Sequence, residues 1–176
     1  MRRRVSKNVK ALVHKISDGL SSIDGLDSST AEEILSAQRV VRFLRGDCKK
    51  YSLEMAIKIM VSVNVRAAVM VYDGGLMFCT NWNRHTFKRP ERKDVESYIR
   101  VLRERIKREV FSVAHRKGIS IPELERINGL SPGYLSRQPN LATVDLWMDV
   151  LISLKTEVAI AMDAWCAEYP VSLQRR

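Results

Sequence analysis

The chain contains little cysteine. Its three cysteines, Cys48, Cys79 and Cys166, are odd in number, far apart in sequence and without CxxC spacing. This pattern argues against a disulfide framework and against a zinc site, and it fits a reducing compartment. We therefore expect a cytoplasmic location, no metal and no cofactor.

A long apolar run is missing as well. No stretch approaches the roughly 20 apolar residues that a membrane-spanning helix needs, so we expect no membrane partner. The basic start, MRRRVSKNVK, has no long apolar stretch after it, and we do not expect a secretory signal. Apolar residues nevertheless make up 45% of the 176 residues, which is enough for the core of one large domain or two small ones.

Catalytic motifs are also absent. His14, His85 and His115 lie among lysines and arginines, with no cysteine or carboxylate cluster beside them. The chain has neither a Walker loop nor a GxSxG motif, and Asp73 with its two following glycines is a turn signal. We predict no catalytic residue and no enzyme activity.

Acidic residues are too few to balance the basic ones: 20 Asp and Glu stand against 30 Lys and Arg, for a net charge of +10. Such a balance favours a polyanionic partner, nucleic acid first and an anionic membrane surface second. Aromatic residues make up 7% of the chain, and we expect most of them in cores. RNA recognition needs exposed aromatic rings for stacking, so it ranks behind DNA binding.

Residues 1–64 read as a helical domain. Apolar residues recur at helical spacing over residues 7–20. A second helix should open at Ser29, with Glu32 closing a capping box. A third, over residues 37–45, turns Val40, Val41 and Leu44 inward and ends at Gly46 in a left-handed conformation. Ser52 is the expected N-cap of a fourth helix.

The pattern changes over residues 65–93. Apolar and β-branched residues flank the Asp-Gly-Gly turn, which predicts a β-hairpin over residues 65–82. A polar, basic linker follows and closes this segment. Because a two-stranded ribbon is marginal alone and its edges invite pairing, we expect a homodimer joined through the hairpin. A hairpin folded back onto its own helices in a monomer is the alternative.

Residues 94–176 read as a second helical domain. A helical pattern with a long apolar stripe begins at Asp94. Ser120 is expected to open a short helix whose inner residues are Leu124 and Ile127. After the turn at Gly129, Ser131 is the expected N-cap of another short helix anchored by Leu135, with Pro132 in its first position. Thr143 should cap the next helix, and a last helix should run from Thr156 through Trp165 to Tyr169. Trp147 and Trp165 are expected in the core.

Both halves contain a brace helix, a tight turn and a short basic helix, the pattern of a helix-turn-helix unit. With its phrases GISIPEL and LSPGYLSR, the second half resembles the XRE, or lambda-repressor-like, family. With Val40, Leu44-Arg45-Gly46 and Tyr51-Ser52-Leu53-Glu54, the first half resembles a shorter antitoxin-like branch of that family. The resemblance implies a mainly α fold with two helix-turn-helix domains linked by a β-hairpin, and a transcriptional regulator from a bacterium or mobile element.

The resemblance and the charge pattern together define the candidate site residues. Expected DNA contacts come from the two short helices: Gln38, Arg39, Arg42, Arg45, Ser131, Gly133, Tyr134, Arg137 and Gln138. Basic residues outside them are expected on the phosphate backbone: Arg2, Arg3, Arg4, Lys49, Lys50, Lys88 and Arg89. The expected partner is double-stranded DNA. The alternative is a protein-interaction module, antitoxin-like or directed against a host protein, in which one helix-turn-helix domain binds a protein.

Overall fold

The computed structural model describes residues 6–63, 67–73, 76–81 and 90–162, and it confirms a mainly helical fold. The first half contains α1 (Lys7–Ser21), α2 (Ser29–Ala31), the π-helical turn η1 (Glu32–Ser36), α3 (Ala37–Leu44) and α4 (Leu53–Ser62). Then come the strands β1 (Ala67–Asp73) and β2 (Leu76–Asn81). The second half contains α5 (Arg92–Arg116), α6 (Ile121–Ile127), α7 (Tyr134–Arg137), the 3-10 turn η2 (Pro139–Leu141), α8 (Val144–Ser153) and β3 (Glu157–Met162).

The N-terminal ends of several helices are capped by hydroxyl side chains, as expected. Ser52 accepts a hydrogen bond from the Met55 N–H, and Thr143 accepts one from the Leu146 N–H. Ser120 does the same for α6. The box predicted for Ser29 and Glu32 is wrong, because α2 begins one residue earlier than expected and Ser28 flanks it without a side-chain cap. The Ser28 hydroxyl instead donates to the Glu32 carboxylate at 2.7 Å.

The predicted hairpin is present, but it belongs to a three-stranded sheet of order β2-β1-β3. β3 replaces the first part of the helix predicted to run from Thr156 to Tyr169, and residues 163–176 lie outside the described part. The helix was predicted from the spacing of apolar residues, which does not include the effect of a free strand edge elsewhere in the chain. β1 provides such an edge and pairs with all six residues of β3. Lys155, two residues after the end of α8, has a left-handed φ of 58°, and the chain turns there toward the sheet.

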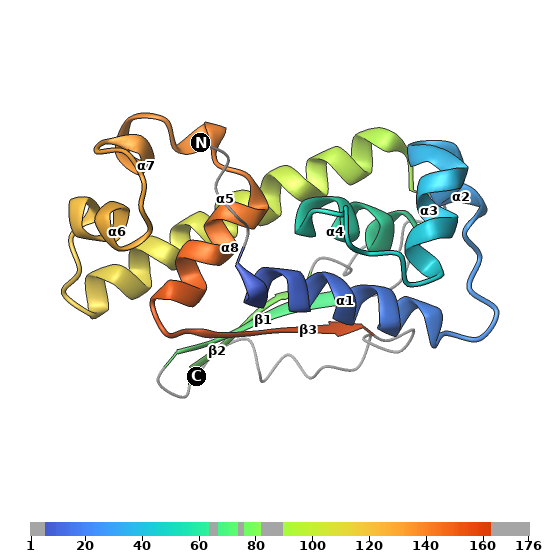
Figure 1. The fold of residues 1–176 in the computed structure, drawn as a ribbon, viewed down its shortest axis with the longest axis horizontal. Helices are drawn as coiled ribbons and strands as arrows, with labels where there is room; N and C mark the ends of the chain where they lie inside the picture. Colours follow the sequence, from blue (N-terminus) through green and yellow to red (C-terminus); the bar gives the residue numbers. More distant parts are fainter. Residues whose placement is uncertain (1–5, 64–66, 74–75, 82–89, 163–176) are drawn as a thin grey trace.

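β1 is therefore the central strand, with β2 on one edge and β3 on the other. The expected two-stranded ribbon with open edges on both strands is wrong in this respect. Dimerisation through residues 65–82 stays a prediction. Figure 1 shows the sheet running along one side of the molecule with α1 beside it, and α1 packs against β3.

One hydrophobic cluster joins the two halves of the sequence. α5 packs on α4 and α8, and α1 also packs on both of these helices. Trp147 is fully buried, and its ring meets the Phe111 ring edge-on at a centroid distance of 5.6 Å. The division into domains at 1–64, 65–93 and 94–176 stays a prediction, but the helices of the outer two segments share this cluster.

Two acidic side chains tie the starts of α4 and α8 together reciprocally. Asp145 accepts hydrogen bonds from the N–H groups of Leu53 and Glu54, at 2.7 and 3.1 Å. In return, Glu54 accepts one from the Val144 N–H at 3.3 Å. Glu54 and Asp145 each occupy the second position of their own helix. Each helix thus supplies a carboxylate for the unsatisfied N–H groups of the other.

The two halves meet where α4 packs on α8 and β1 pairs with β3, and this contact is called the seam below. The spacing of 91 residues that separates Glu54 from Asp145 recurs along it. The N-caps Ser52 and Thr143 are separated by it. In the sheet, Val69 lies opposite Ile160, again at this spacing. The fully buried positions of the two helices also correspond: Leu53, Ala56, Ile57, Ile59 and Met60 match Val144, Trp147, Met148, Val150 and Leu151. Residues that contact their own equivalents indicate an approximate two-fold axis through the seam, as in an isologous interface.

Candidate nucleic-acid interface

α3 presents a row of polar side chains on a firmly held helix. Val40 and Phe43 are fully buried, whereas Gln38, Arg39, Arg42 and Arg45 are all exposed. Val41 and Leu44, which were expected to face inward, are half-buried, because the buried face is formed by Val40 and Phe43 and these two residues lie to one side of it. The predicted outward face of this helix is confirmed.

The rear of α3 is fixed by hydroxyl groups of α1. Ser17, which is buried, donates to the Phe43 carbonyl at 2.6 Å, and Ser21 donates to the Leu44 carbonyl at 2.6 Å. Such bonds satisfy carbonyls at the C-terminal end of a helix that have no partner within it. Gly46, at φ 87°, then turns the chain away in the left-handed conformation expected from the sequence. α3 and α1 therefore hold one relative orientation.

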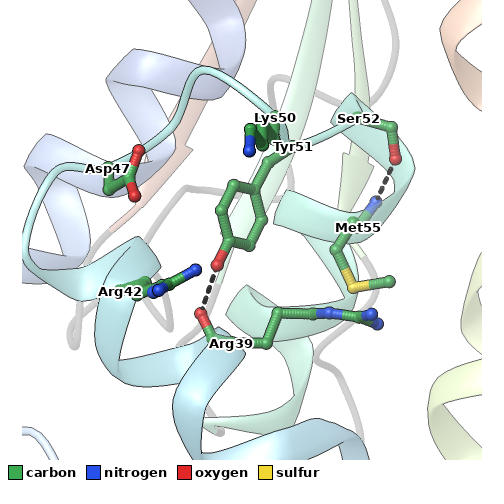
Figure 2. A pocket seen from close by; sticks show the side chains of 7 residues that line it. All are labelled: Arg39, Arg42, Asp47, Lys50, Tyr51, Ser52 and Met55. Atoms are coloured by element: carbon green, nitrogen blue, oxygen red, sulfur yellow. Dashed lines mark hydrogen bonds between the residues drawn. The ribbon is translucent and has the colours of Figure 1, made fainter.

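A hollow of about 350 Å³ lies between α3 and the start of α4 (Figure 2). Its lining residues are Arg39, Arg42, Asp47, Lys50, Tyr51, Ser52 and Met55. Figure 2 shows the Tyr51 ring between Arg42 and Met55, with its hydroxyl directed at Arg39. That hydroxyl donates to the Arg39 carbonyl at 2.6 Å, so Tyr51 links the loop after α3 to the middle of the helix.

Tyr51 remains a neutral donor in this basic setting. Burial raises the pKa of its phenol, and the Asp47 carboxylate raises it further, against the opposing effect of Arg39 and Arg42. Its ring also packs on Phe43, with a centroid distance of 5.0 Å. The backbone N–H groups at the start of α4 are already bonded to Ser52 and Asp145. An anion entering the hollow would therefore be met by arginine and lysine side chains.

In the second half, a buried carboxylate positions the short helix. Glu125 is 2% exposed and accepts hydrogen bonds from the Gly133 and Leu135 N–H groups, both at 2.7 Å. The prediction that Ser131 caps this helix, with Pro132 in its first position, is wrong. α7 begins at Tyr134, after Gly133 at φ 81°, because Glu125 reaches these N–H groups from the brace helix. Leu135 anchors α7 in the core as expected.

Ile127 was expected to face inward from α6, but it is 47% exposed, and Leu124 is the inner residue. Helix α6 is held instead by its last turn. The Asn128 amide donates to the Leu124 carbonyl and to the Ser153 hydroxyl of α8. Gly129, at φ 61°, then makes the predicted turn. The brace helix is thus fixed to α8 through Asn128.

The outward side of α7 carries the remaining candidates. Ser131, Arg137 and Gln138 are exposed, whereas Gly133 and Tyr134 are half-buried. Arg137 folds over the start of its own helix: a Cβ placed on Gly133 would lie 3.0 Å from the Arg137 Nε. The glycine therefore leaves space for this side chain.

The structure gathers the candidates into two groups. The first group is on α3 and the second is on α7, and the two helices lie toward opposite ends of the longest axis of the molecule, with α4 and α8 between them (Figure 1). Lys49 and Lys50 are exposed and follow α3. Arg2, Arg3, Arg4, Lys88 and Arg89 lie outside the described residues.

Four residues that position these groups were not singled out as such from the sequence: Tyr51, Glu54, Glu125 and Asp145. Acidic residues in the first turn of a helix ordinarily indicate a favourable interaction with the helix dipole. The bonds of Glu54 and Asp145 to each other's helices need long-range contacts that no local pattern contains. Glu125 could have been suspected from its place beside the apolar face of α6.

Among the described residues, no group of three or more His, Cys, Asp or Glu side chains is placed to hold a metal ion. Within the same part of the chain, no helix combines the length and apolar character needed to cross a membrane. Comparison of the chain with family models, with curated proteins and with solved structures gave no match.

Proposed function

We propose that the chain is a sequence-specific regulator of transcription that binds double-stranded DNA through two helix-turn-helix units, α2–α3 and α6–α7. The observation that carries this proposal is the pair of short helices with exposed basic side chains, each fixed from behind. Such a helix can enter the major groove, where arginine is suited to guanine and glutamine to adenine. Here Arg39, Arg42 and Arg137 would take the first role and Gln38 the second.

Two further features support a duplex as the partner. The net charge of +10 favours phosphate contacts, and the exposed Lys49 and Lys50 lie beside α3 to make them. Six aromatic residues of the helices and of the loop before α4 are buried or half-buried: Phe43, Tyr51, Tyr98, Phe111, Tyr134 and Trp147. None of these six rings is fully exposed as a stacking platform of the kind used for single-stranded nucleic acid.

The proposal is tested by an electrophoretic shift on the DNA just upstream of the chain's own gene, with random duplex as competitor. We expect a complex that survives the competitor. Arg137→Ala should weaken preferred binding by roughly 1–3 kcal/mol and reduce the preference over random DNA. Arg105→Ala, which removes an exposed arginine of α5, is the matched control and should leave the ratio unchanged.

If upstream and random duplexes bind equally well, and Arg137→Ala changes neither, sequence-specific DNA binding is wrong. The same holds if neither duplex binds. A protein-interaction module would then be the better account.

A further inference from the structure

We infer that one chain forms a complete two-part DNA reader, whose partner is a duplex with two unlike half-sites about one helical turn apart. This inference rests on the proposed function and adds the form of the operator and the stoichiometry. It starts from the seam between the halves, where Asp145 caps α4 and Glu54 accepts from the start of α8.

The seam has the contact pattern of an isologous dimer interface, in which the same patch is used by both partners. In such an interface, a residue on the two-fold axis faces its own equivalent. Val69 and Ile160 meet this condition in the sheet, since they pair in register at the spacing that separates Glu54 from Asp145. A second copy of the chain is therefore not needed to bring two units together.

The sheet leads to the same conclusion. β1 uses one edge for β2 and the other for β3, both within the chain. Both edges of β1 are therefore occupied within the chain, and neither is left for a strand of a second subunit. The intramolecular seam replaces the dimer contact that a single unit would require.

The length of α5, which lies between the two recognition helices α3 and α7, is comparable to one turn of duplex. α5 has 25 residues, and at about 1.5 Å per residue it is roughly 37 Å long. It runs along the longest axis of the molecule, and α3 and α7 lie toward the two ends of that axis (Figure 1). Paired recognition helices bind half-sites whose centres are about 34–36 Å, or 10–10.5 base pairs, apart.

The exposed surfaces of α3 and α7, the two helices proposed to contact DNA bases, differ from each other, although the seam between the halves is nearly symmetric. α3 has 8 residues and exposes Gln38, Arg39 and Arg42, whereas α7 has 4 residues and exposes Arg137. A hollow lined by arginine and lysine side chains adjoins α3. Identical helices related by a two-fold axis select a palindrome. Unlike helices should select two different half-sites, so the operator should be asymmetric.

The test is selection of duplexes from a random pool by the full chain, followed by sedimentation of the chain with the best duplex. We expect one motif with two unlike half-sites, about 10 base pairs between centres, and a complex with one chain of 20.2 kDa per duplex. Arg137→Ala should remove the preference at one half-site alone, and Arg39→Ala with Arg42→Ala the preference at the other. Each loss should be roughly 5- to 150-fold per base position.

A palindromic motif bound by two chains would overturn this inference and leave DNA recognition standing. A motif with a single half-site that is affected by only one set of variants would also overturn it. If no motif is selected at all, the proposed function fails together with the inference. Circular dichroism of each variant confirms that the loss is not a loss of folding.

Discussion

Glu54 and Asp145 occupy the same second position of α4 and α8, and each accepts a backbone hydrogen bond from the start of the other's helix. Glu54 also binds the Arg103 guanidinium of α5 at 3.1 Å, which fixes its carboxylate. The two halves of the chain are thereby held in one arrangement at a point where both helices begin.

Because of these contacts, we expect a conservative substitution at Asp145 to lower the stability of the fold strongly. Asp145→Asn keeps the volume of the side chain but removes the negative charge that accepts from Leu53 and Glu54. Because charge-assisted bonds to buried N–H groups are lost, the free energy of unfolding should fall by about 1.5–3 kcal/mol. Urea unfolding monitored by circular dichroism measures the change. Asp18→Asn, at an exposed position of α1, is the control and should shift stability by less than about 0.5 kcal/mol.

An unchanged urea midpoint in Asp145→Asn would contradict a role for this seam in holding the halves together. A matching loss in the control would show that the effect is not specific to Asp145.

The two turn glycines of the second half separate a backbone effect from a side-chain effect. Both have positive φ, 61° at Gly129 and 81° at Gly133, so alanine at either position should cost about 1–2 kcal/mol of stability. A Cβ at Gly129 meets open space, whereas one at Gly133 lies 3.0 Å from the Arg137 Nε. Gly133→Ala should therefore also displace Arg137 and weaken sequence preference. Competition binding on preferred and random duplex checks this, and equal preference in both variants would contradict it.

Tyr51 should make stability depend on alkaline pH. Its folded pKa is raised above the usual 10.0 by burial and by Asp47. A raised pKa means that the neutral phenol is favoured in the folded state, so its contribution is complete below about pH 10 and is lost as the pH rises through the folded pKa. Tyr51→Phe should cost about 0.5–1.5 kcal/mol at pH 8, because the bond to the Arg39 carbonyl is lost.

The difference in unfolding free energy between the wild-type chain and Tyr51→Phe, measured from pH 8 to 11, should shrink at the upper end. A difference that grows with pH would give the opposite sign and contradict the assignment.

Lys49 and Lys50 should act on affinity without acting on sequence preference. If both contact phosphates, replacing them by alanine should reduce the slope of log affinity against log salt by about 0.9 for each contact. Preferred and random duplexes should weaken alike. Replacing Lys10 and Lys15, two exposed lysines of α1, removes the same charge elsewhere. A slope that falls equally in both double variants would show a general charge effect and no local contact.

Local sequence signals predicted the local structure of this chain well. Ser52, Ser120 and Thr143 cap their helices as expected, and the turn glycines Gly46 and Gly129 have the required left-handed conformation. The outward face of α3 also followed from helical spacing, since Gln38, Arg39, Arg42 and Arg45 are exposed and Val40 is buried. Each of these signals involves residues within a few positions of one another.

What the sequence did not predict depends on partners far along the chain. The segment after Thr156 has helical spacing, yet it forms β3 because β1 provides a pairing edge about 90 residues earlier. Ser131 is a reasonable N-cap by type, but Glu125 reaches the N–H groups first from a neighbouring helix. The two-fold seam itself was hidden, since its equivalent residues, such as Ala56 and Trp147, share burial and not identity.

Hydroxyl-radical footprinting of the DNA upstream of the gene tests the central claim most directly, because it reports groove contacts along one duplex. Binding by the two units predicts two protected patches on one face of the duplex, centred about 10 base pairs apart, with different protection patterns. Arg137→Ala should weaken one patch and leave the other. Uniform protection along the fragment, or no protection at saturating protein, would contradict recognition by two helix-turn-helix units.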